Sequence, residues 1–161
     1  MVDERTRAFG YAACAWAAVF AAISFYWGLG GTFALDTLGL DLERRAREGE
    51  AVSLGIGPGV LKLALAALAL ALAHPPRSPS RRVVSWVALA AGVGMSLYGL
   101  LMTGEKLLMK VGPIDVPASL GSERVGWYLF LWDPFWLLGG VLFIAAALAA
   151  RAGSPTPSAA R

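Results

Sequence analysis

The sequence predicts an all-α integral membrane protein, a four-helix bundle with both termini on the cytoplasmic side. Of its 161 residues, 57% are hydrophobic and only 16% are charged, which is outside the usual composition of a soluble domain. The hydrophobic residues fall into four blocks of about twenty, the length that crosses a bilayer as a helix. The arginines lie outside these blocks, and their distribution favours one orientation in the membrane.

The first predicted span covers residues 9–29 and contains no charged residue. At about 1.5 Å per residue it is long enough to cross a hydrocarbon core of about 30 Å. It is longer than the hydrophobic region of a signal peptide, and it ends in aromatic residues rather than in a small-residue cleavage site. We therefore expect a helix that is retained in the mature protein.

The second and third predicted spans cover residues 55–73 and 83–102. The second is interrupted only by Lys62, and it is followed by His74 and two prolines, which end a helix because proline lacks a backbone donor. The third contains no charged residue. The loop between these two spans, residues 74–82, is short, whereas the loops at residues 30–54 and 103–126 are long.

The fourth predicted span covers residues 127–150 and contains Asp133 and Pro134 near its start. Either Asp133 caps a helix that begins with Pro134, or a longer helix is kinked at this pair. Residues 1–150 then form a single transmembrane domain. Residues 151–161, which are rich in proline and small residues, are predicted to be a disordered cytoplasmic tail.

The loops decide the predicted orientation. The side that holds both termini and the middle loop carries seven basic and two acidic residues, whereas the opposite side carries six basic and eight acidic residues. The middle loop has three arginines and no acid, which favours a cytoplasmic position. The opposite loops are each expected to contain a short surface helix, near residues 42–47 and 105–109, and Gly112 and Pro113 would end the second.

Small residues at helical spacing predict the faces through which the helices pack. Such lines occur on three spans: Ala15, Ala18 and Ala22; Gly55 and Gly59; and Ala88, Gly92 and Ser96. A monomeric bundle in the lipid bilayer needs lines of this kind. The sharper interpretation is that one of them joins the protein to a second copy, as a homodimer, or to a larger membrane complex.

Lys62 and Asp133 are the two charges that hydropathy places inside the spans. Each costs about 2.5 to 3.5 kcal/mol at the centre of a bilayer. Both lie near 10 Å from the outward edge at about 1.5 Å per residue, and small residues share their helix faces. Two interpretations stay open: a buried ion pair, or a lysine that snorkels to the headgroups and an aspartate that caps a helix.

These charges are the centre of a predicted polar pocket that opens outward. The candidate ligand-binding or buried polar residues are Tyr26, Trp27, Lys62, Glu105, Arg124, Trp132, Asp133 and Trp136. Their aromatic members also suit an interfacial belt.

No catalytic residue, metal ligand or cofactor is assigned. The single cysteine, Cys14, excludes a disulfide scaffold and a multi-cysteine zinc site, and the single histidine, His74, argues against a bis-histidine haem. The net charge of +3 is explained by the loops that orient the protein, so no nucleic-acid partner is expected.

Two short runs of the sequence are similar to those of a known protein family. They are FYWGLGG at residues 25–31 and FLWDPFWLLGG at residues 130–140. Together they resemble a family of small bacterial integral membrane proteins that is labelled only as a domain of unknown function. The resemblance implies four spans in a bacterial plasma membrane, and it implies no activity or substrate.

The favoured function is a small non-enzymatic membrane protein whose outward pocket binds or passes a small ligand, or a subunit of a membrane assembly. One alternative is an intramembrane enzyme that acts on a lipid or isoprenoid by proton transfer. In this case Asp133 is the acid or base, and Lys62 or Tyr26 adjusts the proton affinity of its carboxyl group. Another is a dimeric ion-coupled transporter. A single buried carboxylate without a metal-binding motif argues against metal-assisted hydrolysis.

Overall fold

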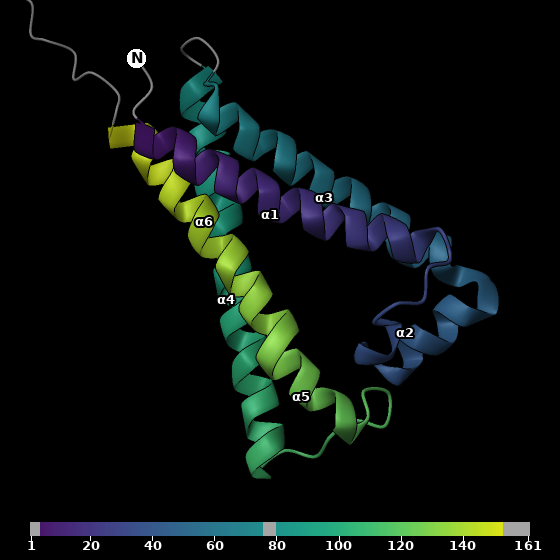
Figure 1. Ribbon diagram of the computed structural model, residues 1–161. Helices are drawn as coiled ribbons and strands as arrows, with labels where there is room; N and C mark the ends of the chain where they lie inside the picture. Colours follow the sequence, from purple (N-terminus) through teal and green to yellow (C-terminus); the bar gives the residue numbers. More distant parts are fainter. Residues whose placement is uncertain (1–3, 76–79, 153–161) are drawn as a thin grey trace, which may run out of the picture.

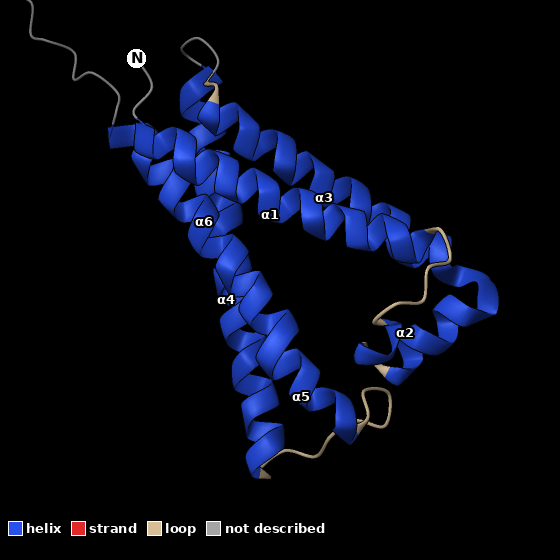
Figure 2. Ribbon diagram, in the orientation of Figure 1, coloured by secondary structure: helices blue, strands red, loops and turns tan. Residues whose placement is uncertain are grey.

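The computed structural model describes residues 4–75 and 80–152, and within these ranges it contains helices and no strands (Figure 2). The elements are α1 (Glu4–Gly28), η1 (Leu35–Thr37), α2 (Leu40–Arg45), η2 (Ala46–Glu50), α3 (Ala51–Ala73), α4 (Ser80–Val111), η3 (Ser122–Arg124), α5 (Val125–Trp127), η4 (Tyr128–Trp132) and α6 (Asp133–Ala152). Four helical segments are long and apolar enough to cross a membrane. The predicted all-α class with four spans is therefore confirmed, and the chain is a multi-pass membrane protein.

The helix boundaries differ from the prediction in two loops and at both ends of the chain. α4 continues to Val111, so the separate surface helix expected near residues 105–109 is wrong: nothing breaks the helix before Gly112, whose φ of 97° ends it. In the other loop, α2 forms near the expected place. α1 begins at Glu4 rather than at residue 9, and α6 continues to Ala152. The rest of the predicted tail, residues 153–161, lies outside the described residues.

The fourth span is a continuous helical segment that contains a wide turn. α5, η4 and α6 follow one another directly, and η4 is a π-helical turn that precedes Pro134. Asp133 has helical backbone angles, φ −69° and ψ −45°, so it is not the cap of a new helix. Pro134 lacks an N–H, and the π turn changes the hydrogen bonding of the helix where that donor is missing.

The four long helices pack as two pairs (Figure 1). α1 lies along α3, and α4 lies along α6. The pairs converge at the end where α1 begins and α6 ends, and they separate toward the end that carries α2 and α5 (Figure 1). Trp16 joins the pairs, because its indole ring packs on Gly139 and its Nε1 donates a 2.9 Å hydrogen bond to the carbonyl of Phe135.

Glycines allow the helices of each pair to approach closely. A Cβ on Gly55 would collide with the backbone of Gly28, and a Cβ on Gly92 would lie 2.9 Å from the carbonyl oxygen of Gly140. Two of the predicted small-residue lines, Gly55 with Gly59 and residues 88, 92 and 96, thus pack between helices.

The third predicted line does not pack within the bundle. Ala15, Ala18 and Ala22 are exposed on the outside of the pair. The buried small residues of α1 are instead Gly10, Ala13, Ala17, Ala21, Ser24 and Gly28. An alanine-rich helix offers small residues on several faces, and the glycines at positions 10 and 28 allow the closest contact.

Candidate functional site

A cavity of about 360 Å³ lies between the two helix pairs, toward their separated end. Six aromatic side chains line it: Phe20, Trp27, Tyr98, Tyr128, Trp132 and Trp136. They come from α1, α4, η4 and α6, while α3 contributes Pro58 and Lys62. Rings on diverging helices leave this space open, and the loop between α1 and α3 covers it.

Lys62 is the charged residue of the cavity lining. Its side chain is buried, with a relative exposure of 8%. Its Nζ donates a 2.6 Å hydrogen bond to Oγ of Ser24 and lies 3.6 Å from the centroid of the Phe20 ring. None of the ion pairs among the described residues includes Lys62. A hydroxyl group and ring faces are thus its neighbours, without a compensating negative charge.

Asp133 faces α4 rather than the cavity. It is 2% exposed, its Oδ2 has no hydrogen-bond partner within the described part of the chain, and the charges that act on it are Lys106 and Glu105. Lys106 is buried as well, and it forms a 2.6 Å ion pair with Glu105. The carboxyl group of Asp133 therefore belongs to a polar seam between α4 and α6.

A direct ion pair between Lys62 and Asp133 is absent from the contacts of the described residues, so this interpretation is wrong. The alternative is wrong too, since Lys62 is buried and Asp133 does not cap a helix. Equal depth does not bring the two residues together because close glycine contacts draw α3 to α1 and α6 to α4. The pairs diverge toward the end that carries α2 and α5 (Figure 1).

Four of the eight predicted site residues line the cavity: Trp27, Lys62, Trp132 and Trp136. The others lie elsewhere. Tyr26 is 47% exposed on the outside of α1, and its hydroxyl accepts a 3.3 Å hydrogen bond from the backbone N–H of Phe33. Asp133 and Glu105 belong to the α4–α6 seam, and Arg124 binds the loop that covers the cavity.

Sequence reasoning missed Phe20, Ser24, Tyr98 and Tyr128. Ser24 has a recognisable signal, because it lies seven residues after Ala17 and four before Gly28 on the buried face of α1. The three aromatic residues have no such signal. Whether a ring lines a cavity or faces lipid depends on how far the helix pairs diverge.

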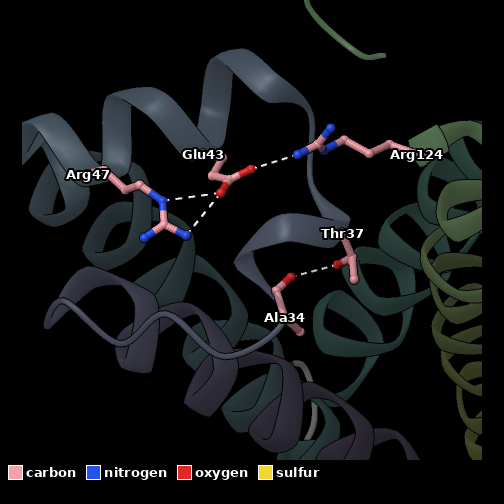
Figure 3. Close-up of polar contacts among 5 residues, drawn as sticks. All are labelled: Ala34, Thr37, Glu43, Arg47 and Arg124. Carbon is pink, nitrogen blue, oxygen red and sulfur yellow. Dashed lines mark hydrogen bonds and ion pairs between the residues drawn. The ribbon is translucent and has the colours of Figure 1, made fainter. Parts of the chain in front are cut away.

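Residues 35–50, which we call the cap segment, cover the cavity through Leu35, Leu38, Leu42 and Ala46. Glu43 is its main polar anchor (Figure 3). It accepts two hydrogen bonds from Arg47, at 2.9 and 3.1 Å, and one from Arg124, at 2.7 Å. Hydrogen bonding to these two arginines lowers the pKa of Glu43 below its usual range. The Arg124 contact ties the cap segment to the helical segment that leads into α6.

The backbone at both ends of the cap segment is unusual. Ala34 precedes it with a left-handed φ of 57°, and its carbonyl accepts a 2.6 Å hydrogen bond from the hydroxyl of Thr37 (Figure 3). Gly49, with a φ of 103°, interrupts the helical backbone just before α3. The indole of Trp132 donates a 3.1 Å hydrogen bond to Thr37, so the segment is also fixed to the cavity wall.

A second, almost wholly apolar groove of about 720 Å³ lies on the other side of Trp27 and Trp132. Its further lining includes Tyr26, Phe33 and Phe135. The two tryptophan rings meet edge to face, with centroids 5.5 Å apart, and form a wall that is common to the groove and the cavity. The site therefore has a charged compartment and an apolar one.

The cavity lining combines one cationic side chain with aromatic walls. No group of three or more His, Cys, Asp or Glu side chains able to hold a metal ion occurs in residues 4–75 and 80–152. The cavity lining also lacks a carboxyl group. What it offers a ligand is one buried cation, one serine hydroxyl, two tyrosine hydroxyls and ring faces.

Comparison with protein-family models identifies the family of the chain. The model of a family described as "Protein of unknown function (DUF3995)" matches residues 17–143. The comparisons with curated proteins and with solved structures give no match. The matched range contains both sequence runs that carried the resemblance, at residues 25–31 and 130–140, and it confirms a family labelled only as a domain of unknown function. The chain belongs to the DUF3995 family.

Proposed function

We propose that this membrane protein binds a small anionic ligand with an apolar body in the cavity between its helix pairs. The observation that carries the proposal is the buried ammonium group of Lys62, which lines the cavity and has no acidic partner among the described residues. A buried charge is costly unless an opposite charge accompanies it. A carboxylate or similar anion in the cavity would provide that charge.

The rest of the lining sets the character of the ligand. Aromatic rings from α1, α4, η4 and α6 surround Lys62, and aliphatic side chains of the cap segment close the cavity. A volume of about 360 Å³ is near the lower end of the range of roughly 300 to 1,000 Å³ for small-molecule sites. These features favour one anionic group attached to a compact apolar body.

A matched pair of probes tests the proposal. Decanoate and decanol have the same chain length, and only decanoate carries a negative charge. A ligand that binds only the folded state raises the melting temperature, and the rise grows with the ratio of the free ligand concentration to the Kd. We expect decanoate to stabilise the purified wild-type protein in detergent more than decanol does, and we expect Lys62→Met to abolish that difference.

Lys110→Met is the control, because it removes the same charge from an exposed position outside the cavity lining. It should keep the full difference between decanoate and decanol. If Lys62→Met kept the difference as well, Lys62 would not be the group that recognises the anion, and the proposal would fail.

A second candidate function is ion-coupled transport, which the buried, unpartnered Oδ2 of Asp133 favours. A carboxyl group in this position can take up and release a proton. In that case decanoate binding should release or take up protons in weakly buffered solution, and Asp133→Asn should remove this proton signal.

Proton transfer between Asp133 and Lys62 in an enzyme is less well supported, since Asp133 does not line the cavity.

We also propose that both termini are cytoplasmic in the plasma membrane, so that the cavity opens outward. The arginine-rich, acid-free middle loop supports this orientation. A topology reporter inserted between Glu43 and Glu50 should read as external, and one fused after Arg161 as cytoplasmic.

Assembly as a homodimer or within a larger complex is part of the proposal, and native mass spectrometry of the purified protein tests it.

A further inference from the structure

Two arginines link α4 and α6 at the end of the molecule opposite the cavity, where α4 begins and α6 ends. Nη2 of Arg81, on α4, donates a 2.7 Å hydrogen bond to the backbone carbonyl of Ala150 on α6. Nε of Arg151, on α6, donates a 3.0 Å hydrogen bond to Oγ of Ser85 on α4. Because these bonds cross between the helices in opposite directions, both guanidinium groups belong to one α4–α6 junction.

The guanidinium group of Arg151 is held in a defined orientation. Its central carbon lies 3.5 Å from the centroid of the Trp86 ring, and its Nε is fixed by Ser85. Ser85 is buried and donates in turn to the carbonyl of Ala147. A planar guanidinium that is stacked on an indole loses little freedom when it binds another group.

The hydrogen-bonding capacity of both arginines is incompletely used. Nε of Arg81 and Nη2 of Arg151 are buried and have no partner in the described structure. Neither arginine takes part in any of the ion pairs formed by the described residues. Buried charged donors without an acceptor are unfavourable. Both arginines are of intermediate exposure, so the junction lies at the surface of the helix pair.

We infer that Arg81 and Arg151 bind a phosphate group, which a membrane lipid headgroup supplies. Two arginines offer donors in fixed forks that match phosphate oxygens. The neighbouring Trp86 is 54% exposed at the end of its span, which is typical of the level of lipid headgroups. Basic pockets between transmembrane helices at this level recognise anionic headgroups. The site is independent of Lys62 and of the proposed function.

The test compares dioctanoyl phosphatidate with dioctanoylglycerol, which lacks the phosphate, on the full-length protein in detergent. Native mass spectrometry counts the bound lipid. We expect phosphatidate to bind and dioctanoylglycerol not to be retained. Arg81→Gln and Arg151→Gln should each weaken phosphatidate binding about tenfold, the scale expected for loss of a charge-assisted hydrogen bond.

Arg82→Gln is the matched control, because Arg82 is the exposed neighbour of Arg81. It should change the affinity less than about twofold, the small effect expected of an exposed charge. An equal loss in Arg82→Gln would show attraction to the whole basic surface and would overturn the site, as would equal retention of the two lipids.

Two further arms make the result decisive. Inorganic phosphate at millimolar concentration should fail to displace phosphatidate; displacement would assign the site to free phosphate and overturn the lipid source. If the Gln variants do not fold, Arg151→Lys keeps the charge and loses the planar fork, and it should still weaken binding several-fold. Unchanged binding by a folded Arg151→Lys variant would overturn the role of the fork.

Discussion

The converging end of the helices and their separated end have different interiors. At the converging end the core consists mainly of small residues such as Ala13, Ala69, Ala146 and Ala150, with Phe143 fully buried among them. At the separated end it consists of aromatic rings and two buried lysines. Small residues let helix backbones touch and leave no space. Rings on diverging helices leave a cavity, and our proposal places the ligand at this separated end.

The two buried lysines sharpen this comparison. Lys62 and Lys106 are 8% and 6% exposed, respectively, and each belongs to a different helix pair. Lys106 has Glu105 as an ion-pair partner and acts on Asp133, whereas Lys62 has a serine and aromatic rings. The same residue type thus completes a polar seam in one pair and faces a cavity in the other.

The largest expected effect is that of Lys106→Met. It leaves the buried carboxyl group of Asp133 without its compensating cation, at a cost of about 3 kcal/mol, less if the acid takes up a proton. Reversible unfolding in a single detergent measures the loss. Lys62→Met should not destabilise the ligand-free protein, because no acid is left behind. If both substitutions cost the same, the contrast between the two lysines is wrong.

The glycine contacts predict the next largest effect. A Cβ on Gly92 would lie 2.8 Å from the backbone nitrogen of Ile144, whereas a Cβ on Gly94 would have open space around it. We expect Gly92→Ala to destabilise the protein by about 1 to 3 kcal/mol. Gly94→Ala should stabilise it by about 0.5 to 1 kcal/mol, because alanine is the better helix former.

The same unfolding measurement checks the glycine pair. Similar effects of the two substitutions would mean that α4 and α6 are not in close contact at Gly92, and the division into pairs would have to be revised.

A double-mutant cycle tests which lysine acts on Asp133. Asp133→Asn and Lys106→Met should be coupled by about 0.5 to 3 kcal/mol, the scale for neighbouring residues. The effects of Asp133→Asn and Lys62→Met on the free energy of unfolding should be additive to within about 0.5 kcal/mol. Strong coupling of Lys62 to Asp133 in these free energies of unfolding would contradict the assignment of the two charges to separate helix pairs.

The smallest effect concerns the cap segment. Glu43→Gln should cost about 1 kcal/mol or less at pH 7, since it weakens two partly exposed ion pairs. The pKa of Glu43 is lower in the folded protein than in the unfolded chain, so its contribution is present above about pH 4.5 and is lost as the pH falls further.

The difference in unfolding free energy between the wild type and Glu43→Gln should therefore shrink toward zero below that pH. Glu48→Gln, at an exposed position, is the control and should show little difference at any pH. A Glu43→Gln effect that persisted in acid would mean that its ion pairs do not hold the cap segment.

The four spans, the line of residues 88, 92 and 96, and the buried small-residue face around Lys62 were determined by the sequence alone. Hydrophobicity over about twenty residues and helical spacing are local properties, so they can be read without a structure. The π turn before Pro134 was only partly predictable, as a choice between a cap and a kink.

The tertiary structure decided which helices form pairs and how far the pairs diverge. Because the pairs diverge, Lys62 contacts the hydroxyl of Ser24 and Asp133 lies under the influence of Lys106, although equal depth along parallel helices would have allowed the two to meet. The partner of a buried charge depends on the direction in which its helix face is turned and on the distance to the next helix. Both follow from contacts between distant segments, such as Gly28 with Gly55 and Gly92 with Gly140, and no local pattern encodes them.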